Sequence, residues 1–206
     1  MKSPVVTCLD MEGVLTPEIW LALAEKTGIT DLNVTTRDIP DYDELMKLRL
    51  AILAKFDLKL SDITEVVAGL KPLDGAVEFL TWLRERCQVI ILSDSYYDLV
   101  SPLMKQLHYP SIFCHTLKID DKGYIRNYAL RQQDQKRHAV AAVKSLNFHV
   151  LAAGDSYNDL SMLQEADAGF FFRPPDSICS EYPQFPVTRS YPELMERFVS
   201  AGGLSH

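Results

Sequence analysis

The sequence contains no apolar run approaching the roughly 18 residues that a membrane-spanning helix needs. Its first apolar stretch, residues 5–9, ends at Asp10 and is too short for the h-region of a secretory signal. We therefore expect a cytoplasmic protein with no membrane partner. Basic residues are also few, 21 against 28 acidic ones, and the net charge is −7. Because affinity for nucleic acid depends on Lys and Arg neutralising phosphates, this composition argues against a nucleic-acid partner.

Cysteine is scarce as well, and its spacing argues against two common uses. None of the four cysteines forms a C-x-x-C pair, and a chain of 206 residues can bury a core without disulfides. We interpret Cys8, Cys87, Cys114 and Cys179 as reduced, mostly buried apolar residues. The histidines show no metal-ligand spacing either, so we expect them to be structural.

Short apolar runs without a clean alternation are typical of parallel strands that are covered on both faces. Helical patterns lie between most of these runs, and strands alternating with helices predict an α/β fold with a doubly wound parallel sheet. The predicted strands are residues 5–9, 89–92, 112–114, 150–153 and 169–172. The predicted helices between them are residues 76–86, 136–146 and 158–165.

The interval between the first two predicted strands breaks this rhythm, because it is far too long for a single crossover. Its patterns are helical over three segments, residues 17–26, 42–56 and 61–70. Pro17 favours the start of the first helix, and Ser61-Asp62 favours the start of the third. We expect a small helical cap over residues 15–72, inserted into an α/β core formed by residues 1–14 and 73–206.

Two further segments stand outside the alternation of strands and helices. Residues 117–119 and 124–126 flank Asp120-Asp121-Lys122-Gly123, which predicts a β-hairpin. The tail, with prolines at 174–175 and within 183–186, is expected to be loop-rich up to a last helix over residues 192–200.

Polar residues follow the predicted strands at the points where the strands end. Asp10 and Glu12 follow the first strand, Ser93-Asp94 follows the second, and Asp155 and Asp159 follow a later one. Lys136 opens the helix before that later strand. In open α/β sheets ligands bind outside the carboxyl ends of the strands, so we expect these side chains to share one crevice.

Such a set of residues suits phosphoryl transfer. Clustered carboxylates repel one another unless a cation lies between them, and oxygen ligands without His or Cys favour Mg²⁺. A lysine, a serine hydroxyl and backbone N–H groups suit phosphate oxygens. An aspartate can also act as a nucleophile and form an aspartyl-phosphate. The pattern therefore predicts a magnesium-dependent reaction through a covalent intermediate.

Four segments, in this order, resemble the motifs of the haloacid dehalogenase superfamily of phosphatases. They are Asp10-Met11-Glu12-Gly13-Val14, then Ser93, then Lys136, then Gly154-Asp155-Ser156-Tyr157-Asn158-Asp159. The resemblance implies a Rossmann-like, haloacid dehalogenase-like core. Within the superfamily the chain resembles the phosphoserine phosphatase-like members in particular. These carry a glutamate and a cap arginine, which here would be Glu18 and Arg49. Within them it is closest to the bifunctional phosphoserine phosphatase/homoserine phosphotransferases, on the first motif and on residues 35–42 and 183–186.

The resemblance implies a role for each motif residue in the reaction. Asp10 would be the nucleophile and a metal ligand, Asp155 a second metal ligand, and the backbone carbonyl of Glu12 a third. The Glu12 side chain would be the general acid and base. Asp159 either orients the site or stabilises a helix N-terminus.

The resemblance also implies the contacts to the substrate, a small phosphorylated amino acid. Lys136 and Ser93 would hold the phosphate, with Asp94 and Asn158 beside them. Glu18 would bind the ammonium and Arg49 the carboxylate of the amino acid; the alternatives are a helix-stabilising acid and a solvent-exposed cap residue. Met46 would contact the apolar part of the substrate or belong to the cap core. The subgroup alone suggests a homodimer.

Glu12 departs from the superfamily, most of whose phosphatases have Asp at this position. The extra methylene shifts the carboxyl group, and a misplacement on the order of 1 Å can lower a rate ~100-fold. Either the pocket is shaped to fit Glu12, or water is activated more slowly and the aspartyl-phosphate stays open to attack by another hydroxyl. The resemblance implies hydrolysis of O-phospho-L-serine, and slower activation of water would add transfer to homoserine. The alternatives are the same chemistry on a sugar or nucleotide phosphate, and a non-catalytic phospho-accepting signalling module.

Overall fold

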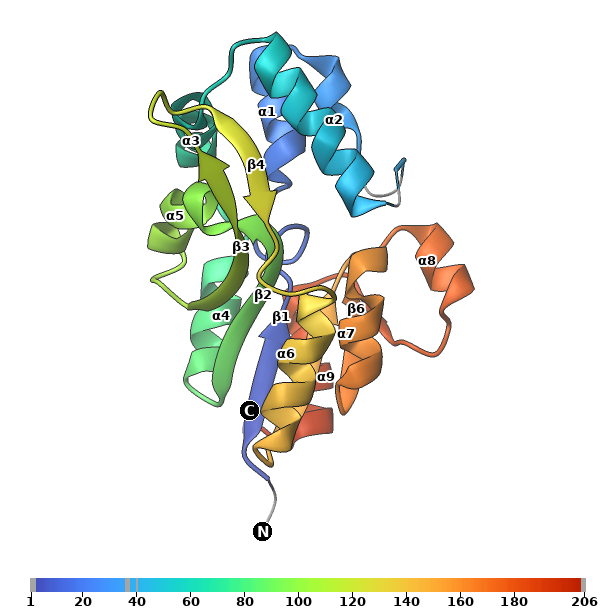
Figure 1. Ribbon diagram of the computed structural model, residues 1–206. Coiled ribbons are helices and arrows are strands. Elements are labelled where there is room, and N and C mark those ends of the chain that lie inside the picture. The colour runs from blue at the N-terminus through green and yellow to red at the C-terminus, as the bar shows by residue number, and fades with distance from the viewer. Residues whose placement is uncertain (1–2, 36–37, 40, 205–206) are drawn as a thin grey trace.

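A computed structural model describes residues 3–35, 38–39 and 41–204 of the chain. Thr36, Arg37 and Pro40, which belong to the segment 35–42 that carries part of the family resemblance, lie outside the described residues. Figure 1 shows a central sheet with helices on both faces and a group of helices above the carboxyl ends of its strands. Among the residues that the structure describes, no helix is long and apolar enough to span a bilayer.

The sheet has the order β4-β3-β2-β1-β5-β6-β7, and all its pairs are parallel except β3 with β4. Its strands are β1 (Val5–Leu9), β2 (Gln88–Tyr96), β3 (Ser111–Ile119), β4 (Ile125–Ala129), β5 (His149–Gly154), β6 (Ala168–Phe172) and β7 (Val187–Thr188). The prediction of a doubly wound, mostly parallel sheet is confirmed. The strand order reverses at β1, because the chain first moves from β1 to β2 and later returns to β5 on its other side.

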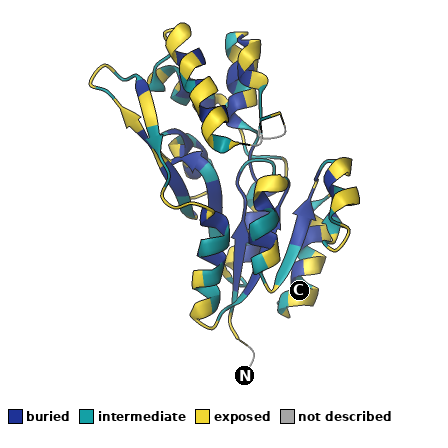
Figure 2. Cartoon of the chain, turned by 45° about the vertical axis from the view of Figure 1, so that its right-hand side comes forward, coloured by how far each residue is buried: buried dark blue, intermediate teal, exposed yellow. Residues whose placement is uncertain are grey.

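Two apolar cores lie on the two faces of the sheet. Leu9 of β1 belongs to the core that also holds Phe79 and Phe198, and Cys8 belongs to the core that holds Val140 and Met162. Successive residues of a strand point to opposite faces, so a run such as Val-Val-Thr-Cys-Leu can serve both cores. Figure 2 shows the central strands as the most buried part of the chain, and it shows the outer helix faces and much of the β3–β4 hairpin as exposed.

Helices occupy the predicted crossovers and two places that the sequence did not indicate. The helices outside the insertion are α4 (Ala76–Arg84), α5 (Tyr97–Gln106), α6 (Gln135–Ser145), α7 (Leu160–Glu165), α8 (Asp176–Glu181) and α9 (Tyr191–Gly202). The sequence analysis missed α5, because Pro102 interrupts a pattern that the structure nevertheless keeps helical. It was also wrong to leave residues 176–188 as loop, since α8 and β7 lie there.

The long interval between β1 and β2 is helical, as predicted, and in its described residues it contains no strand beyond an isolated bridge between Glu12 and Thr16. It holds α1 (Ile19–Thr27), a 3₁₀ turn (Thr30–Asn33), α2 (Tyr42–Lys55) and α3 (Leu60–Gly69). The cap boundaries at residues 15 and 72 stay a prediction.

Two predicted helix starts in this insertion need correction. The first helix begins at Ile19 rather than at Pro17, because the Glu12 carboxylate accepts the Ile19 N–H at 2.8 Å and fixes the first turn there. The third begins at Leu60 after Lys59, and Asp62 accepts the Lys59 N–H at 2.7 Å from inside the helix.

The predicted hairpin is confirmed as the antiparallel pair β3 and β4. Its turn is held by Asp120, whose Oδ1 accepts the N–H groups of Lys122 and Tyr124, both at 2.9 Å. The hairpin extends beyond the sheet to the inserted helices, where the Leu60 N–H donates to the Gly123 carbonyl at 2.9 Å. The four cysteines are free, as expected: two are buried and two are half-buried.

Candidate active site

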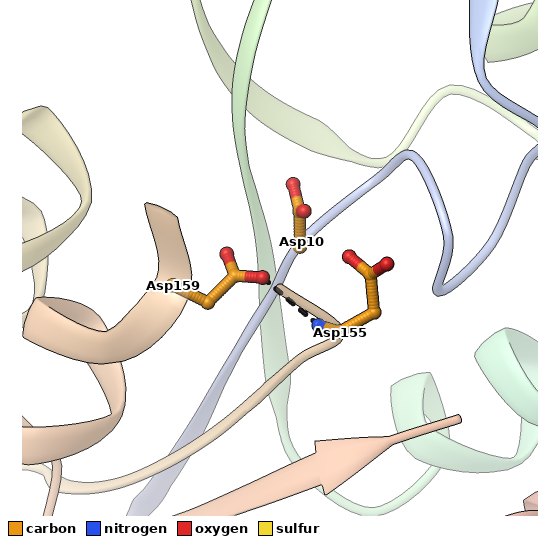
Figure 3. Close-up of side chains that lie close together, drawn as sticks. All are labelled: Asp10, Asp155 and Asp159. Atoms are coloured by element: carbon orange, nitrogen blue, oxygen red, sulfur yellow. Dashed lines mark hydrogen bonds between the residues drawn. The ribbon is translucent and has the colours of Figure 1, made fainter. Parts of the chain in front are cut away.

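Three aspartates meet at the carboxyl end of the two central strands. Asp10 follows β1, and its N–H extends the sheet by donating to the Ala153 carbonyl of β5 at 2.9 Å. Asp155 follows β5, and Asp159 ends the short 3₁₀ turn (Tyr157–Asp159) after it. Each offers a carboxylate oxygen within 4.8 Å of the others, and Figure 3 shows the three side chains gathered around one point.

Two glycines make this close approach possible. A Cβ at Gly13, whose φ is +78°, would lie 2.4 Å from Cγ of Asp155. A Cβ at Gly154 would lie 2.3 Å from Cγ of Asp159. Both distances are far below van der Waals contact, so these positions require glycine for steric reasons and, at Gly13, also for its left-handed backbone.

Lys136, in the first turn of α6, supplies the positive charge of this group. Its Nζ lies 2.7 Å from Asp159 Oδ1, 2.9 Å from Asp10 Oδ1 and 3.4 Å from Asp94 Oδ2. The side chain is almost fully buried. Asp159 also accepts the N–H groups of Asp155 and Ser156 through its other oxygen, so it both closes the turn and holds the lysine. We call Asp10, Lys136, Asp155 and Asp159 the aspartate–lysine cluster.

The charge balance of the aspartate–lysine cluster favours a bound cation. Burial, with Asp159 and Asp155 nearby, raises the pKa of Asp10 well above its usual range, and the Lys136 ammonium offsets this only in part. Three buried carboxylates facing one ammonium leave an excess of negative charge. Oxygen-only donors are those that hard divalent cations prefer, so the residues present fit such an ion.

A cavity of about 220 Å³ opens above this cluster. Asp10 and Asp155 line it on one side, and Glu12, Glu18 and Arg49 line it as well. We call the last three the arginine–glutamate cluster, and the cavity the inner cavity. Ser93 and Asn158, both predicted to contact the phosphate, line the same cavity. The structure therefore brings every predicted site residue except Lys136, Asp159 and Met46 to the wall of one cavity. Lys136 Nζ lies 2.9 Å from Asp10 and 2.7 Å from Asp159.

Arg49 is buried, with 8% of its surface exposed, so the alternative of a solvent-exposed cap residue is wrong. Its Nη2 donates to the Val34 carbonyl at 3.1 Å, and its guanidinium lies 4.6 Å above the ring centre of Trp20. Its Nε has no hydrogen-bond partner among the described residues. A buried guanidinium with an unused donor is expected where a carboxylate ligand binds. Met46 is fully buried in the apolar core, with its sulfur 3.9 Å from Arg49 Nη1.

Glu12 is the most perturbed acid of the arginine–glutamate cluster. Burial and the neighbouring Glu18 carboxylate raise the pKa of Glu12 to about 8, against the pull of the Ile19 N–H and of Arg49. A carboxylic acid that keeps its proton near neutral pH can give that proton to a leaving group. Glu18 caps α1 through its backbone position and lies at the cavity wall.

Ser93 and Asp94 lie inside β2, where the sequence analysis had placed the end of that strand. The pairing of β2 with β1 stops at Ile91, while its pairing with β3 continues with a register shift between Leu92 and Tyr96. The irregular stretch frees these side chains for the site. Ser93 is buried, and its Oγ accepts the Ser95 N–H at 3.2 Å.

Several residues near Asp94 were not singled out by the sequence analysis. Tyr42 donates from its hydroxyl to the Asp94 carbonyl at 2.9 Å, and Gln135 donates to the Ser93 carbonyl at 2.6 Å. His115 lies with its Nε2 3.6 Å from Asp94 Oδ1. The adjacency of Gln135 to Lys136 was a usable signal, whereas Tyr42 and His115 reach the site only through the tertiary fold. A second cavity of about 1000 Å³, the outer cavity, shares Tyr42, Asp94 and Asn158 with the inner one.

Comparison with known proteins gives a consistent result. Residues 6–167 match the family described as haloacid dehalogenase-like hydrolase. The chain is 58% identical over 200 residues to a protein of Pseudomonas aeruginosa named phosphoserine phosphatase ThrH, covering 97% of this chain and 98% of that protein. It is 57% identical over 196 residues to a phosphoserine phosphatase of Pseudomonas syringae pv. tomato, covering 95% and 83% of the two chains.

A solved structure described as a phospho-aspartyl intermediate analogue of phosphoserine phosphatase superposes on this chain with a TM-score of 0.78. The alignment covers 96% of this chain and 99% of that one, at 16% sequence identity. At that identity the likeness shows that the two chains share a fold.

Proposed function

The chain belongs to the haloacid dehalogenase-like hydrolase family, and from that premise we propose that it hydrolyses O-phospho-L-serine to L-serine and phosphate through a phosphorylated Asp10. The main support is that a single cavity is lined both by Asp10 and Asp155 of the aspartate–lysine cluster and by the whole arginine–glutamate cluster. The first suits a phosphoryl group, and the second offers opposite charges for an ammonium and a carboxylate. A phosphorylated amino acid presents these three groups together.

Asp10, Asp155 and the backbone carbonyl of Glu12 would hold Mg²⁺, which would supply positive charge beside the phosphoryl oxygens. The Asp10 carboxylate attacks the phosphorus atom, and the bond between phosphorus and the seryl oxygen breaks. Glu12, protonated before the reaction, gives its proton to that oxygen, and serine leaves. The support for this role is the raised pKa of Glu12, which keeps the proton available near neutral pH.

The second half of the reaction regenerates Asp10. Water attacks the phosphorus of the aspartyl-phosphate while Glu12 takes the water proton, and phosphate leaves. Ser93, Lys136 and Asn158 hold the phosphoryl oxygens in both halves. Their support is their position around Asp10: Lys136 Nζ is 2.9 Å from its carboxylate, and Ser93 and Asn158 line the same cavity wall.

Arg49 and Glu18 bind the amino-acid part of the substrate. Arg49 binds the substrate carboxylate with the donor that lacks a partner in the described residues, and Glu18 binds the ammonium. The buried position of the guanidinium supports this role, because a buried charge gains most from an opposite charge where water is excluded.

The phosphoryl group of Asp10 also passes to homoserine. In that step the homoserine hydroxyl takes the place of water, loses its proton to Glu12 and becomes the phosphate ester. Support comes from glutamate at position 12, whose added methylene displaces the base relative to an aspartate. Further support is the likeness to the protein named ThrH over nearly the whole chain. Cytoplasmic location and a homodimer stay predictions.

The test is a phosphate-release screen with Mg²⁺ over phosphoserine, sugar phosphates and nucleotide monophosphates. The screen is repeated on phosphoserine with homoserine present, and phosphohomoserine is measured by mass spectrometry. We expect phosphoserine to give the highest kcat/KM and homoserine to divert part of the phosphoryl group. A higher kcat/KM on a sugar or nucleotide phosphate overturns the assignment of the substrate, and no turnover of any ester overturns the catalytic proposal.

A further inference from the structure

Asp94 contributes a third carboxylate around Lys136, beside Asp10 and Asp159, and it belongs to neither the aspartate–lysine nor the arginine–glutamate cluster. It lies on the irregular part of β2 and lines both the inner and the outer cavity. Its side chain is 29% exposed, which makes it more accessible than Asp10 or Asp159. A carboxylate repels a phosphate dianion, so direct contact with the phosphoryl group is unfavourable. Its neighbours indicate another role.

The two oxygens of Asp94 have different partners. Oδ1 accepts from Gln135 Nε2 at 3.1 Å and lies 3.6 Å from His115 Nε2. Oδ2 accepts from Asn158 Nδ2 at 3.0 Å and lies 3.4 Å from Lys136 Nζ. One oxygen therefore faces two fixed groups of the protein frame, and the other faces two side chains that we assign to the phosphoryl group.

The groups that hold Oδ1 are themselves oriented. The His115 ring accepts the Arg131 N–H at Nδ1, at 3.1 Å, so the proton of the neutral ring lies on Nε2 and faces Asp94. The side-chain oxygen Oε1 of Gln135 accepts from Arg131 Nε and Nη2, at 3.2 Å and 3.1 Å. This turns the side-chain nitrogen Nε2 toward Asp94 and the Ser93 backbone carbonyl. Both side chains are buried, with 3% and 2% of their surface exposed.

Oδ2 helps to orient the two side chains that face it, together with their other partners; for Asn158 the other partner is the Ser156 hydroxyl, which donates to its Oδ1. A carboxylate only accepts, so the Asn158 side chain turns its Nδ2 toward Asp94, although the residue itself is exposed. Lys136 has three rotatable N–H donors, of which Asp10 and Asp159 take two. Asp94 gives the third a direction.

We propose that Asp94 is a positioning residue whose carboxylate orients Asn158 and Lys136 toward the phosphoryl group. This proposal rests on the proposed function, because it assumes that Asn158 and Lys136 contact the phosphoryl group of the substrate. Asp94 acts on the substrate through them, and His115 with Gln135 keeps its carboxylate in place. The hydrogen bond from the Tyr42 hydroxyl to the Asp94 backbone carbonyl, at 2.9 Å, ties the same residue to the inserted helices.

Asp94→Asn keeps the shape of the side chain and places an N–H donor where a carboxylate oxygen was. We expect kcat on phosphoserine to fall about 10- to 100-fold, because a displacement on the order of 1 Å has that effect, while KM changes less than about threefold. In the free enzyme, the side-chain amide resonance of Asn158 should shift in this variant. The matched control is Glu181→Gln, which removes a carboxylate that lines the outer cavity and accepts from the Tyr157 hydroxyl. It should leave kcat and the Asn158 resonance unchanged.

Double variants distinguish positioning from a structural defect. His115→Phe should lower kcat about tenfold alone and by less than about twofold in the Asp94→Asn background, because its effect passes through Asp94. His115→Gln, which keeps a donor and an acceptor, should recover most of the activity. Asp94→Asn should also have a smaller effect in the Asn158→Ala background. Fully multiplicative effects in both double variants overturn the proposal.

Two other outcomes also overturn it. One is a kcat for Asp94→Asn within twofold of the wild-type value, and the other is a raised KM with unchanged kcat, which indicates direct contact with the substrate. The same variants are measured on p-nitrophenyl phosphate, which shares only the phosphoryl group with phosphoserine. If the wild-type enzyme hydrolyses this ester but not phosphoserine, the substrate assignment fails, while the role of Asp94 is still tested on the aryl ester.

Discussion

The aspartate–lysine cluster and the arginine–glutamate cluster meet at the same cavity, but their charges are satisfied to different degrees. Lys136 has three carboxylates within 3.4 Å, and Asp159 accepts two backbone N–H groups as well. Arg49, by contrast, has a buried Nε without a partner in the described chain, and burial beside Glu18 leaves Glu12 with a raised pKa. In the first cluster the cation is surrounded by anionic acceptors, and the second cluster is incomplete because its cation keeps a donor without an acceptor in the described chain.

This difference separates chemistry from recognition. Asp10 and Asp155 directly follow strands of the sheet, Asp159 ends the 3₁₀ turn after β5 and Lys136 lies on α6, so the geometry of the aspartate–lysine cluster is fixed before any ligand binds. In the arginine–glutamate cluster, Arg49 lies on α2 and Glu18 precedes α1, and an amino acid would supply the charges that this cluster lacks. We expect damage to the first cluster to abolish turnover of every substrate, and loss of Arg49 or Glu18 from the second to change which substrate is preferred. Glu12, the proposed general acid and base, serves the chemistry as well.

Replacement of Asp10 is the largest expected effect. Asp10→Asn removes the proposed nucleophile and one proposed metal ligand while keeping the shape of the side chain, so phosphate release should fall by at least about 10⁴-fold on all esters. EDTA should lower the wild-type activity similarly, and Mg²⁺ should restore it. The measurement is initial phosphate release, with Asp121→Asn, an exposed carboxylate of the hairpin turn, as the control. Undiminished release by Asp10→Asn or in EDTA would contradict the covalent mechanism.

Replacement of Arg49 should weaken the binding of phosphoserine rather than slow the chemical step. Arg49→Ala leaves the carboxylate of phosphoserine without its partner, and the loss of one partner of a buried charge pair costs roughly 2–5 kcal/mol. We expect KM for phosphoserine to rise about 100-fold, with kcat changed much less. Phosphoethanolamine has no carboxylate, so its kinetic constants should change little.

The comparison of these two esters makes the Arg49 experiment internally controlled. A loss of folding or of catalytic geometry would lower activity on both, whereas loss of carboxylate binding lowers it on phosphoserine alone. Arg126→Ala, which removes an exposed arginine of the hairpin, controls for the change in net charge. An equal change in the kinetic constants of both esters in Arg49→Ala would show that Arg49 does not bind the substrate carboxylate.

The two clusters also differ in how far the sequence could predict them. Asp10 and Asp155 follow buried strands directly, and the carboxyl ends of parallel strands meet at one edge, so their convergence could be inferred from the pattern. The need for glycine at positions 13 and 154 became visible only with the side chains in place. A Cβ at Gly13 would collide with Asp155, which is remote in sequence, and one at Gly154 would collide with Asp159, five residues away. The sheet, the hairpin and the helical insertion were predictable for the same local reasons.

The environment of Asp94 could not be predicted from local pattern. Tyr42, His115 and Gln135 come from the insertion, from β3 and from α6, and they meet because β2 continues past its last pair with β1. A short apolar run does not indicate how long a strand continues after the run ends. Arg49 was open to two interpretations from spacing alone, and burial decided against one of them.

The smallest expected effect concerns the free energy of unfolding in the absence of metal and substrate. Under these conditions the arginine–glutamate cluster should destabilise the folded chain. The folded-state pKa of Glu12 is about 8, and its ordinary value is 4.5. Between these values the unfolded chain releases the Glu12 proton while the folded chain keeps it, so this group lowers the free energy of unfolding as pH rises from 4.5 to 8. Glu12→Gln is neutral in both states, and its amide oxygen can still accept the Ile19 N–H. The variant should therefore be about as stable as the wild type near pH 4.5 and more stable at pH 8, by on the order of 1–3 kcal/mol.

Urea unfolding in EDTA at a series of pH values measures this difference, and Glu25→Gln, which removes an exposed carboxylate on α1, controls for the loss of one negative charge. A difference between Glu12→Gln and the wild type that does not grow with pH would mean that Glu12 is ionised in the free enzyme, and the contrast between the two clusters would then rest on Arg49 alone.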